Sequence, residues 1–192
     1  PNLPSALRGH YRLYLLGLLS SRLGQDDRAN GYARDLDRLP APAGTGGVVA
    51  GLAATVRADV ALRQGRAAEA LRLLSPANST VPLELVYVKP FVNAREYTQE
   101  HARYLRAEAL LATGAVDEAR RWFANSFQGS PSEMAYLAPM HARLGAILDR
   151  AGSSAEAAAH LRKVVTMWQG SDPALHPVVA AAKASLRRLE SK

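Results

Sequence analysis

Apolar residues recur at every third or fourth position along much of the chain, which is the spacing of one face of an α-helix. In the last such segment they form one stripe, made of Leu175, Val178, Val179, Ala182, Leu186 and Leu189. Alanine- and leucine-rich segments with a helical pattern precede it. The pattern predicts an all-α fold with helices at about 5–23, 26–39, 48–64, 66–75, 94–113, 115–127, 132–151, 153–169 and 174–190.

Four similar segments separate these helices. Each begins with a glycine (Gly24, Gly65, Gly114 or Gly152) and has an alanine five residues later. Glycine ends a helix well because it tolerates the left-handed conformation after the last turn. The acidic or small polar residues that follow suit the start of the next helix, and the alanine lets two helices approach closely. A site that performs chemistry would not recur four times, so we interpret these segments as structural corners between paired helices.

Several further positions repeat around the corners. A Leu-Gly pair precedes the corner glycine by seven residues at Leu16-Gly17 and at Leu144-Gly145. Ala58 and Ala107 hold the equivalent small position in the two middle pairs, and Phe123 and Leu161 follow the corner alanine by four residues. With these positions, residues 5–170 resemble the tetratricopeptide repeat (TPR) family.

The resemblance implies a right-handed α-solenoid in a single domain, residues 1–192. Its four helix pairs would lie at about 5–39, 46–77, 94–128 and 132–169, and the helix at 174–190 would cap the last apolar edge. The repeats are degenerate, since their spacing exceeds the roughly 34 residues of a typical unit. The usual first-helix tryptophan is replaced by Leu13, Ala54, Arg103 and His141, and arginines stand at two leucine positions, Arg57 and Arg106.

In TPR arrays the first helices line a concave groove that holds a peptide or a partner helix. Carried over by helical spacing, the partner-binding residues here would be Tyr11, Tyr14, Asp59, His101, Tyr104 and Glu108. Tyrosine suits recognition because it combines a large apolar face with a polar tip. The alternative is that these residues pack against neighbouring repeats or against the apolar segment 81–97. That segment would fill the groove, cover a helix edge or form an exposed patch.

The segments 136–139 and 167–175 are similar to the ends of TPR regions in bacterial multidomain regulators, where a kinase or winged-helix domain accompanies the repeats. The resemblance implies a non-catalytic module that binds a protein or peptide and scaffolds or regulates an attached effector domain. A sensory domain that binds a small ligand between repeats is the alternative. The abundance of alanine and arginine indicates a GC-rich bacterial genome.

Composition limits the other classes of function. The 192 residues are 48% hydrophobic, which is enough for a core, and there is no cysteine, so thiolate metal sites and cysteine nucleophiles are excluded. The net charge of +7 permits acidic partners. Acidic residues interleave with the arginines around residues 96–121, which favours pairs within helices over a nucleic-acid surface. Nucleic-acid binding is therefore the third hypothesis.

Signatures of catalysis and of membrane insertion are missing from the sequence. The five histidines form no His-x-x-x-His or His-Glu-x-x-His motif, and no pair of acids stands out as a general acid and base. The glycine-rich segment 44–47 lacks the Gly-Lys-Ser/Thr ending of a phosphate loop and reads as a linker. We therefore predict no enzyme, no cofactor and no metal. With neither a membrane-length apolar run nor a signal peptide, we expect a cytoplasmic protein, or alternatively an extracytoplasmic domain of a membrane-anchored regulator.

Overall fold

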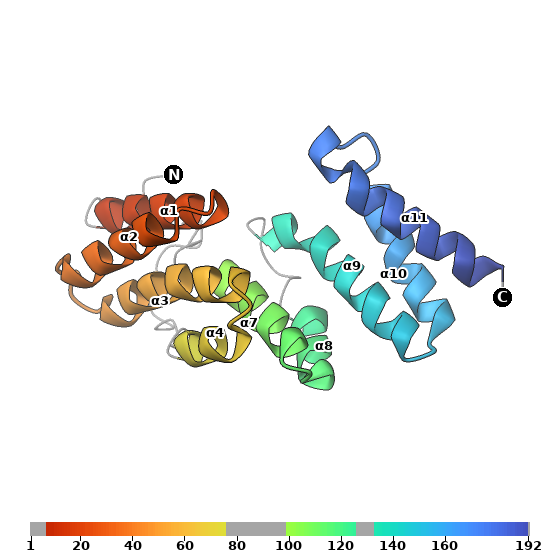
Figure 1. Ribbon diagram of the computed structural model, residues 1–192, viewed down its shortest axis with the longest axis horizontal. Helices are drawn as coiled ribbons and strands as arrows, with labels where there is room; N and C mark the ends of the chain where they lie inside the picture. Colours follow the sequence, from red (N-terminus) through yellow and green to blue (C-terminus); the bar gives the residue numbers. More distant parts are fainter. Residues whose placement is uncertain (1–6, 76–98, 126–132, 192) are drawn as a thin grey trace. The chain divides into compact units, whose positions relative to one another are not determined.

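The computed structural model describes residues 7–75, 99–125 and 133–191, and every regular element in these ranges is a helix (Figure 1). The chain divides into two compact units, residues 1–115 and 116–192. The first unit contains α1 (Arg8–Arg22), α2 (Asp26–Arg38), α3 (Gly46–Arg63), α4 (Ala67–Leu74) and α7 (Glu100–Ala112). The second contains α8 (Val116–Asn125), α9 (Met134–Arg150), α10 (Ser154–Met167), the 3-10 turn η4 (Pro173–Leu175) and α11 (His176–Glu190).

The predicted all-α architecture of paired helices is confirmed. Most described helix ends lie within two residues of the predicted ones. The predicted start of the first helix near residue 5 lies outside the described residues, which begin at Leu7. The predicted start of the helix at 94–113 lies outside the described residues, and so does the whole apolar segment 81–97. No helix in the described ranges is both long enough and apolar enough to cross a membrane.

All four corners have the same backbone geometry. The glycines are left-handed, with φ of 72° at Gly24, 76° at Gly65, 85° at Gly114 and 81° at Gly152. At each corner the residue after the glycine donates its N–H to the carbonyl five positions earlier, and the glycine itself donates to the carbonyl three positions earlier. These two bonds define a Schellman motif, which satisfies the free carbonyls at the end of a helix. The corner glycines were therefore correctly predicted from sequence.

Within each unit the helices pack in chain order. In the first unit α1 contacts α2, α2 contacts α3, α3 contacts α4, and α4 contacts α7. The first helices also contact one another, α1 with α3 and α3 with α7. In the second unit α8 packs on α9, α9 on α10, and α10 on α11. This sequential packing is that of a helical repeat array.

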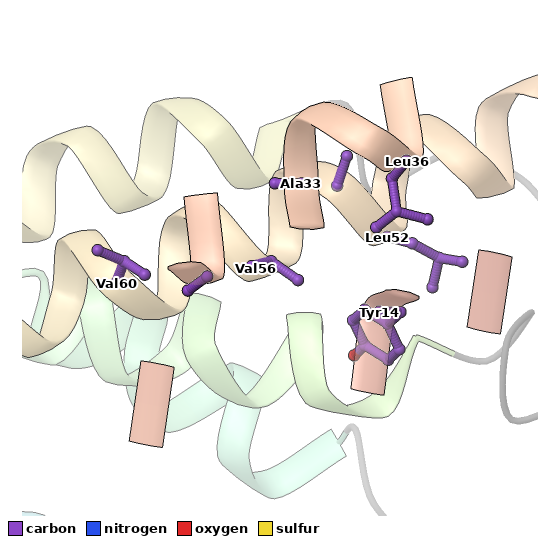
Figure 2. Packing of buried hydrophobic residues seen from close by; sticks show 8 residues of the cluster. Tyr14, Ala33, Leu36, Leu52, Val56 and Val60 are labelled. Atoms are coloured by element: carbon purple, nitrogen blue, oxygen red, sulfur yellow. The ribbon is translucent and has the colours of Figure 1, made fainter. Parts of the chain in front are cut away.

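The core of the first unit depends on small residues at the helix contacts. Ala29, five residues after the first corner glycine, is fully buried, as are the equivalent alanines of the other three corners. Tyr14 of α1 lies in a cluster with Leu36 of α2 and with Val56 of α3 (Figure 2). Beside it, Gly17 is so close to α3 that a Cβ there would meet both methyl groups of Val56 at 2.9 Å. The predicted small position of the first pair is thus a site of close helix approach.

The second unit repeats this arrangement and ends in a cap. A Cβ added at Gly145 of α9 would meet Cγ of Leu161 of α10 at 2.8 Å, so the Leu-Gly pair and the large apolar position of the repeat contact each other. Ala182, Leu186 and Leu189 of α11 share a buried cluster with residues of α9 and α10. The last helix therefore covers the apolar edge of the preceding pair, as predicted.

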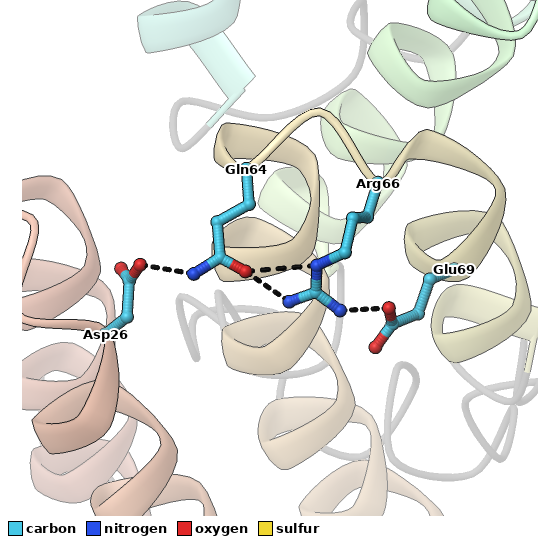
Figure 3. Close-up of polar contacts among 4 residues, drawn as sticks. All are labelled: Asp26, Gln64, Arg66 and Glu69. Atoms are coloured by element: carbon cyan, nitrogen blue, oxygen red, sulfur yellow. Dashed lines mark hydrogen bonds and ion pairs between the residues drawn. The ribbon is translucent and has the colours of Figure 1, made fainter.

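Polar side chains connect neighbouring corners at the surface of the first unit. Gln64, at the end of α3, donates from Nε2 to Oδ2 of Asp26 at 2.5 Å and accepts from Nε of Arg66 at 3.0 Å (Figure 3). Arg66 also pairs with Glu69 on the first turn of α4. Such exposed pairs each contribute about 0–1 kcal/mol, so they orient the corners more than they stabilise them.

The close approach at Gly17 yields a stability prediction with a matched control. We expect Gly17→Ala to lower the free energy of unfolding by about 1–3 kcal/mol, because Val56 is fully buried and its branched side chain has one preferred rotamer. Gly31 lies in the interior of α2, where a Cβ would meet nothing closer than 3.8 Å. Gly31→Ala should therefore raise stability by about 0.5–1 kcal/mol. Urea unfolding followed by circular dichroism measures both, and equal effects would contradict this packing.

Candidate functional site

The middle first helix, α3, is buried along most of its length. It lies between α1 and α2 on one side and α4 and α7 on the other. Its apolar residues are accordingly distributed around the whole helix, as expected for a helix at the centre of a core. One acidic residue, Asp59, is buried among them at 6% exposure. A buried carboxylate requires polar partners, so the partners of Asp59 show whether this site is structural or chemical.

Asp59 joins three helices through hydrogen bonds. Ser21 of α1 donates from Oγ to Asp59 Oδ2 at 2.5 Å, and Nε2 of His101 on α7 lies 3.3 Å from Asp59 Oδ1. Ser21 is fully buried and His101 is 8% exposed. The three side chains therefore connect α1, α3 and α7, the row of first helices, through one carboxylate.

The electrostatics favour an ionised Asp59. Burial by itself would raise its pKa, but the hydrogen bonds from His101 and Ser21 and the charges of His101 and Arg22 together outweigh burial. The net result is a pKa below the ordinary value of 3.8. Charge-assisted hydrogen bonds of this kind are stronger than neutral ones, and leaving one member without its partner is costly.

Ser21, Asp59 and His101 are the residue types of a hydrolytic triad, but their order differs. In a triad the histidine lies between the other two and takes the proton of the serine hydroxyl. Here the carboxylate lies in the middle, so the hydroxyl donates to Asp59 rather than to an imidazole. Ser21 is also inaccessible to a substrate. The arrangement fixes helices and activates no nucleophile.

All six residues predicted for the groove lie on α1, α3 and α7 of the first unit. Tyr14, Asp59 and His101 are buried. Tyr11, Tyr104 and Glu108 are half-buried. The structure brings Asp59 and His101 together, and it places the rings of Tyr11 and Tyr14 with centroids 5.9 Å apart. Their role in binding stays a prediction. By burial they form two groups, the three buried residues and the three half-buried ones.

Sequence reasoning missed Ser21. Its corner position next to Arg22 gives no local indication of a partner on another helix. The signal that could have identified the cluster is Asp59 itself, because the only acid of a mostly apolar helix requires a donor when it is buried. The two donors come from 38 and 42 residues away in sequence, so the fold was needed to name them.

A second polar contact joins α9 and α10 in the second unit. Nδ1 of His141 lies 2.8 Å from Nδ1 of His160, so one neutral ring donates its Nδ1–H to the other. Burial, then the charges of His160 and Lys163, lower the pKa of His141 to about 4. Burial and Lys163 also lower the pKa of His160, although Glu156 opposes this. Both rings are therefore neutral near pH 7. Within the described residues, no group of three or more histidines or acids could hold a metal ion.

The second unit also has a hollow of about 470 Å³ where α10 ends and α11 begins. Val165 and Val179 give it apolar walls, Trp168 an aromatic face, and His176 and Lys183 polar groups.

Comparison with protein families found matches in two stretches of the chain. Residues 51–76 and 101–125 are tetratricopeptide repeats. The first stretch covers most of α3 and all of α4, and the second covers most of α7 and all of α8. TPRs generally mediate protein–protein interactions and are typically non-catalytic. Comparison with curated proteins and with solved structures gave no match.

The match corresponds to the second and third predicted helix pairs, and Asp59 and His101 belong to these two TPRs. The hydrogen bond between them therefore connects the first helices of two TPRs directly. The first and fourth pairs have the same corner geometry as the matched ones. Their membership in the family stays a prediction.

The buried carboxylate predicts a pH-dependent contribution to stability. At neutral pH we expect Asp59→Asn to lower the free energy of unfolding by about 1–3 kcal/mol, because it weakens two charge-assisted hydrogen bonds. The pKa of Asp59 is depressed in the folded state, so its contribution is complete above the ordinary value of 3.8 and is lost as the pH falls below it. The difference between wild type and variant should therefore shrink in acid. Asp35→Asn, at an exposed position of α2, should change stability by about 0.5 kcal/mol or less in urea titrations.

The histidine pair predicts acid sensitivity of the second unit. The folded pair resists protonation, whereas unfolded histidines take up protons near 6.5, so stability should fall as the pH drops from 6.5 toward 4. His141→Gln should flatten this dependence. His176→Gln, at an exposed position, should leave it unchanged. Thermal unfolding followed by the fluorescence of Trp122 and Trp168 at several pH values tests this, and parallel curves for wild type and His141→Gln would contradict it.

Proposed function

We propose that the chain is a non-catalytic module that binds a protein or peptide on its row of first helices. The observation that carries the proposal is the hydrogen bond between Asp59 and His101, which joins the first helices of two matched TPRs. A surface built on helices that are fixed in this way is pre-organised, so most of the ordering cost of binding falls on the partner.

The burial of the six groove residues supports two different roles. In this proposal Tyr11, Tyr104 and Glu108 contact the partner, because parts of their side chains are exposed. Tyr14, Asp59 and His101 hold the helices beneath them. A tyrosine pair with a neighbouring acid would favour a partner segment that presents apolar and basic or hydrogen-bonding side chains.

The wider role we propose is scaffolding, or regulation of an attached effector domain, in a bacterial cytoplasmic regulator. This part rests on the resemblance of the C-terminal segments to bacterial multidomain regulators.

Nucleic-acid binding is less well supported, because surface ion pairs reduce the local positive potential that it would require. Arg57 pairs with Asp37, Arg162 with Glu190, and Arg188 with Asp149.

A second candidate function rests on the hollow between α10 and α11. Its aromatic, cationic and apolar groups would suit a small anionic ligand, as in a sensory domain. Saturable thermal stabilisation by a metabolite, lost in Lys183→Gln, would favour this function over protein binding.

The groove proposal predicts that Tyr104→Ala abolishes partner capture without unfolding the chain. Wild type and variant would serve as baits in a lysate of the source organism, with retained proteins identified by mass spectrometry and bait folding checked by circular dichroism. Tyr32→Ala is the matched control, because Tyr32 is a half-buried tyrosine on α2, a second helix, where it contacts Arg28. We expect a partner retained by wild type and Tyr32→Ala and lost with Tyr104→Ala. A partner retained equally by all three would refute the groove assignment.

A further inference from the structure

Two leucines of α1 and the leucine that caps its C-terminal end are exposed in one row. Leu15, Leu19 and Leu23 have exposed fractions of 48%, 54% and 63%. Residues four apart lie on successive turns of the same helix face, so these side chains form a continuous line, here termed the leucine ridge. Single exposed leucines are ordinary on protein surfaces, whereas contiguous exposed apolar patches are typical of interaction sites.

The leucine ridge is not a part of the core of the first unit. The buried residues of α1 include His10, Tyr14, Gly17 and Ser21, which lie on the opposite side of the helix. That side packs against α2 and α3, and α1 lies at the edge of the first unit (Figure 1). A surface helix normally carries polar residues opposite its buried face. Here the outer face of α1 carries leucines instead, and this outer row requires its own explanation.

The charged side chains of α1 itself are all basic, and the nearest acids along the chain, Asp26 and Asp27, follow the Leu23 end of the ridge. Arg8 and Arg12 continue the same row toward the start of α1, and Arg22 lies beside its other end. All three are exposed, and α1 has no acidic residue. In the part of the chain that the structure describes, Arg8 and Arg12 form no ion pair. The start of the helix adds the positive end of its dipole, so this outer surface is apolar with a basic end.

We propose that the leucine ridge is a docking site for an acidic amphipathic helix of another protein. The partner helix would place apolar residues spaced by three and four against Leu15, Leu19 and Leu23, and carboxylates against Arg8 and Arg12. The leucine ridge adjoins the proposed groove at Tyr11, four residues before Leu15, but it goes beyond the groove because it contains none of the groove residues of α3 and α7.

The shape of the surface favours a helix over a membrane. A single row of side chains fits the groove between the rows of a second helix. Membrane-bound helices instead embed a broad apolar face, which α1 lacks because its opposite side is buried in the fold. A second copy of the chain is disfavoured by charge, since it would bring another α1 without acidic residues and a net charge of +7.

The probe is a synthetic peptide of about 20 residues, long enough to be partly helical in water, with leucines on one face and glutamates in the turns at one end. A matched peptide carries lysines in place of the glutamates. Fluorescence anisotropy with the full chain should show micromolar binding of the glutamate peptide and at least about tenfold weaker binding of the lysine peptide. Leu19→Gln should weaken binding about tenfold or more, and Arg12→Gln should weaken it severalfold and reduce its salt dependence.

Two controls separate this site from others. Val178→Gln replaces an exposed apolar residue on α11 and should leave binding unchanged. Tyr104→Ala, the groove variant, should also leave it unchanged, so failure of either proposal is recognised independently. The inference is overturned if the two peptides bind equally, if Leu19→Gln has no effect, or if the glutamate peptide fails to bind. Leu19-dependent binding to anionic phospholipid vesicles, or Leu19-dependent self-association in sedimentation, would likewise overturn it and assign the ridge to a membrane or to a second copy.

Discussion

The close approach of helices at small residues is the constraint on which this fold depends. Fully buried alanines follow every corner, and at Gly17 and Gly145 the neighbouring helix lies where a Cβ would otherwise be. Such contacts bring the backbones near enough for Leu161 of α10 to pack directly against Gly145 of α9. The corner glycines make this possible, since their left-handed conformation turns the chain sharply while hydrogen bonds satisfy the helix end. The geometry of the corners and the close packing of the helices therefore depend on each other, and both recur along the chain.

Within that framework, a single charge determines how the row of first helices is held. Asp59 is buried in an apolar helix and is stable there because Ser21 and His101 donate to it from both neighbours. Apolar contacts alone would tolerate small slips of one helix past another, whereas hydrogen bonds to one carboxylate specify a register. A binding surface formed by parallel helices depends on that register. The polar cluster thus connects the stability of the first unit to the function proposed for it.

Much of the fold could be predicted because its signals are local. The interval from Gly24 to Ala29 contains the whole corner, and the spacing of Val179, Ala182 and Leu186 marks the buried face of the capping helix. The state of Asp59 could not be predicted in this way. Helical spacing predicts Asp59 on the inner row with Tyr14, yet it cannot show that Asp59 is buried there, because the groups that bury it come from distant helices. His160 was missed for the same reason, since its partner His141 lies on a different helix. Local patterns determine where helices begin and end, while burial depends on contacts between them.

The two faces of α1 show how a repeat helix can serve two purposes. Its inner side supplies Tyr14 and Ser21 to the core and to the carboxylate cluster, so that side is fixed by packing. Its outer side does not pack within the first unit, so polar residues there would not lower the free energy of unfolding. Leucines at that side, with arginines on the same row, instead expose apolar area to water without an internal gain. An exposed apolar row on an otherwise well-packed helix is therefore better explained by a partner than by the fold, and the rigidity that Asp59 gives to α1 would also hold that row in place for docking.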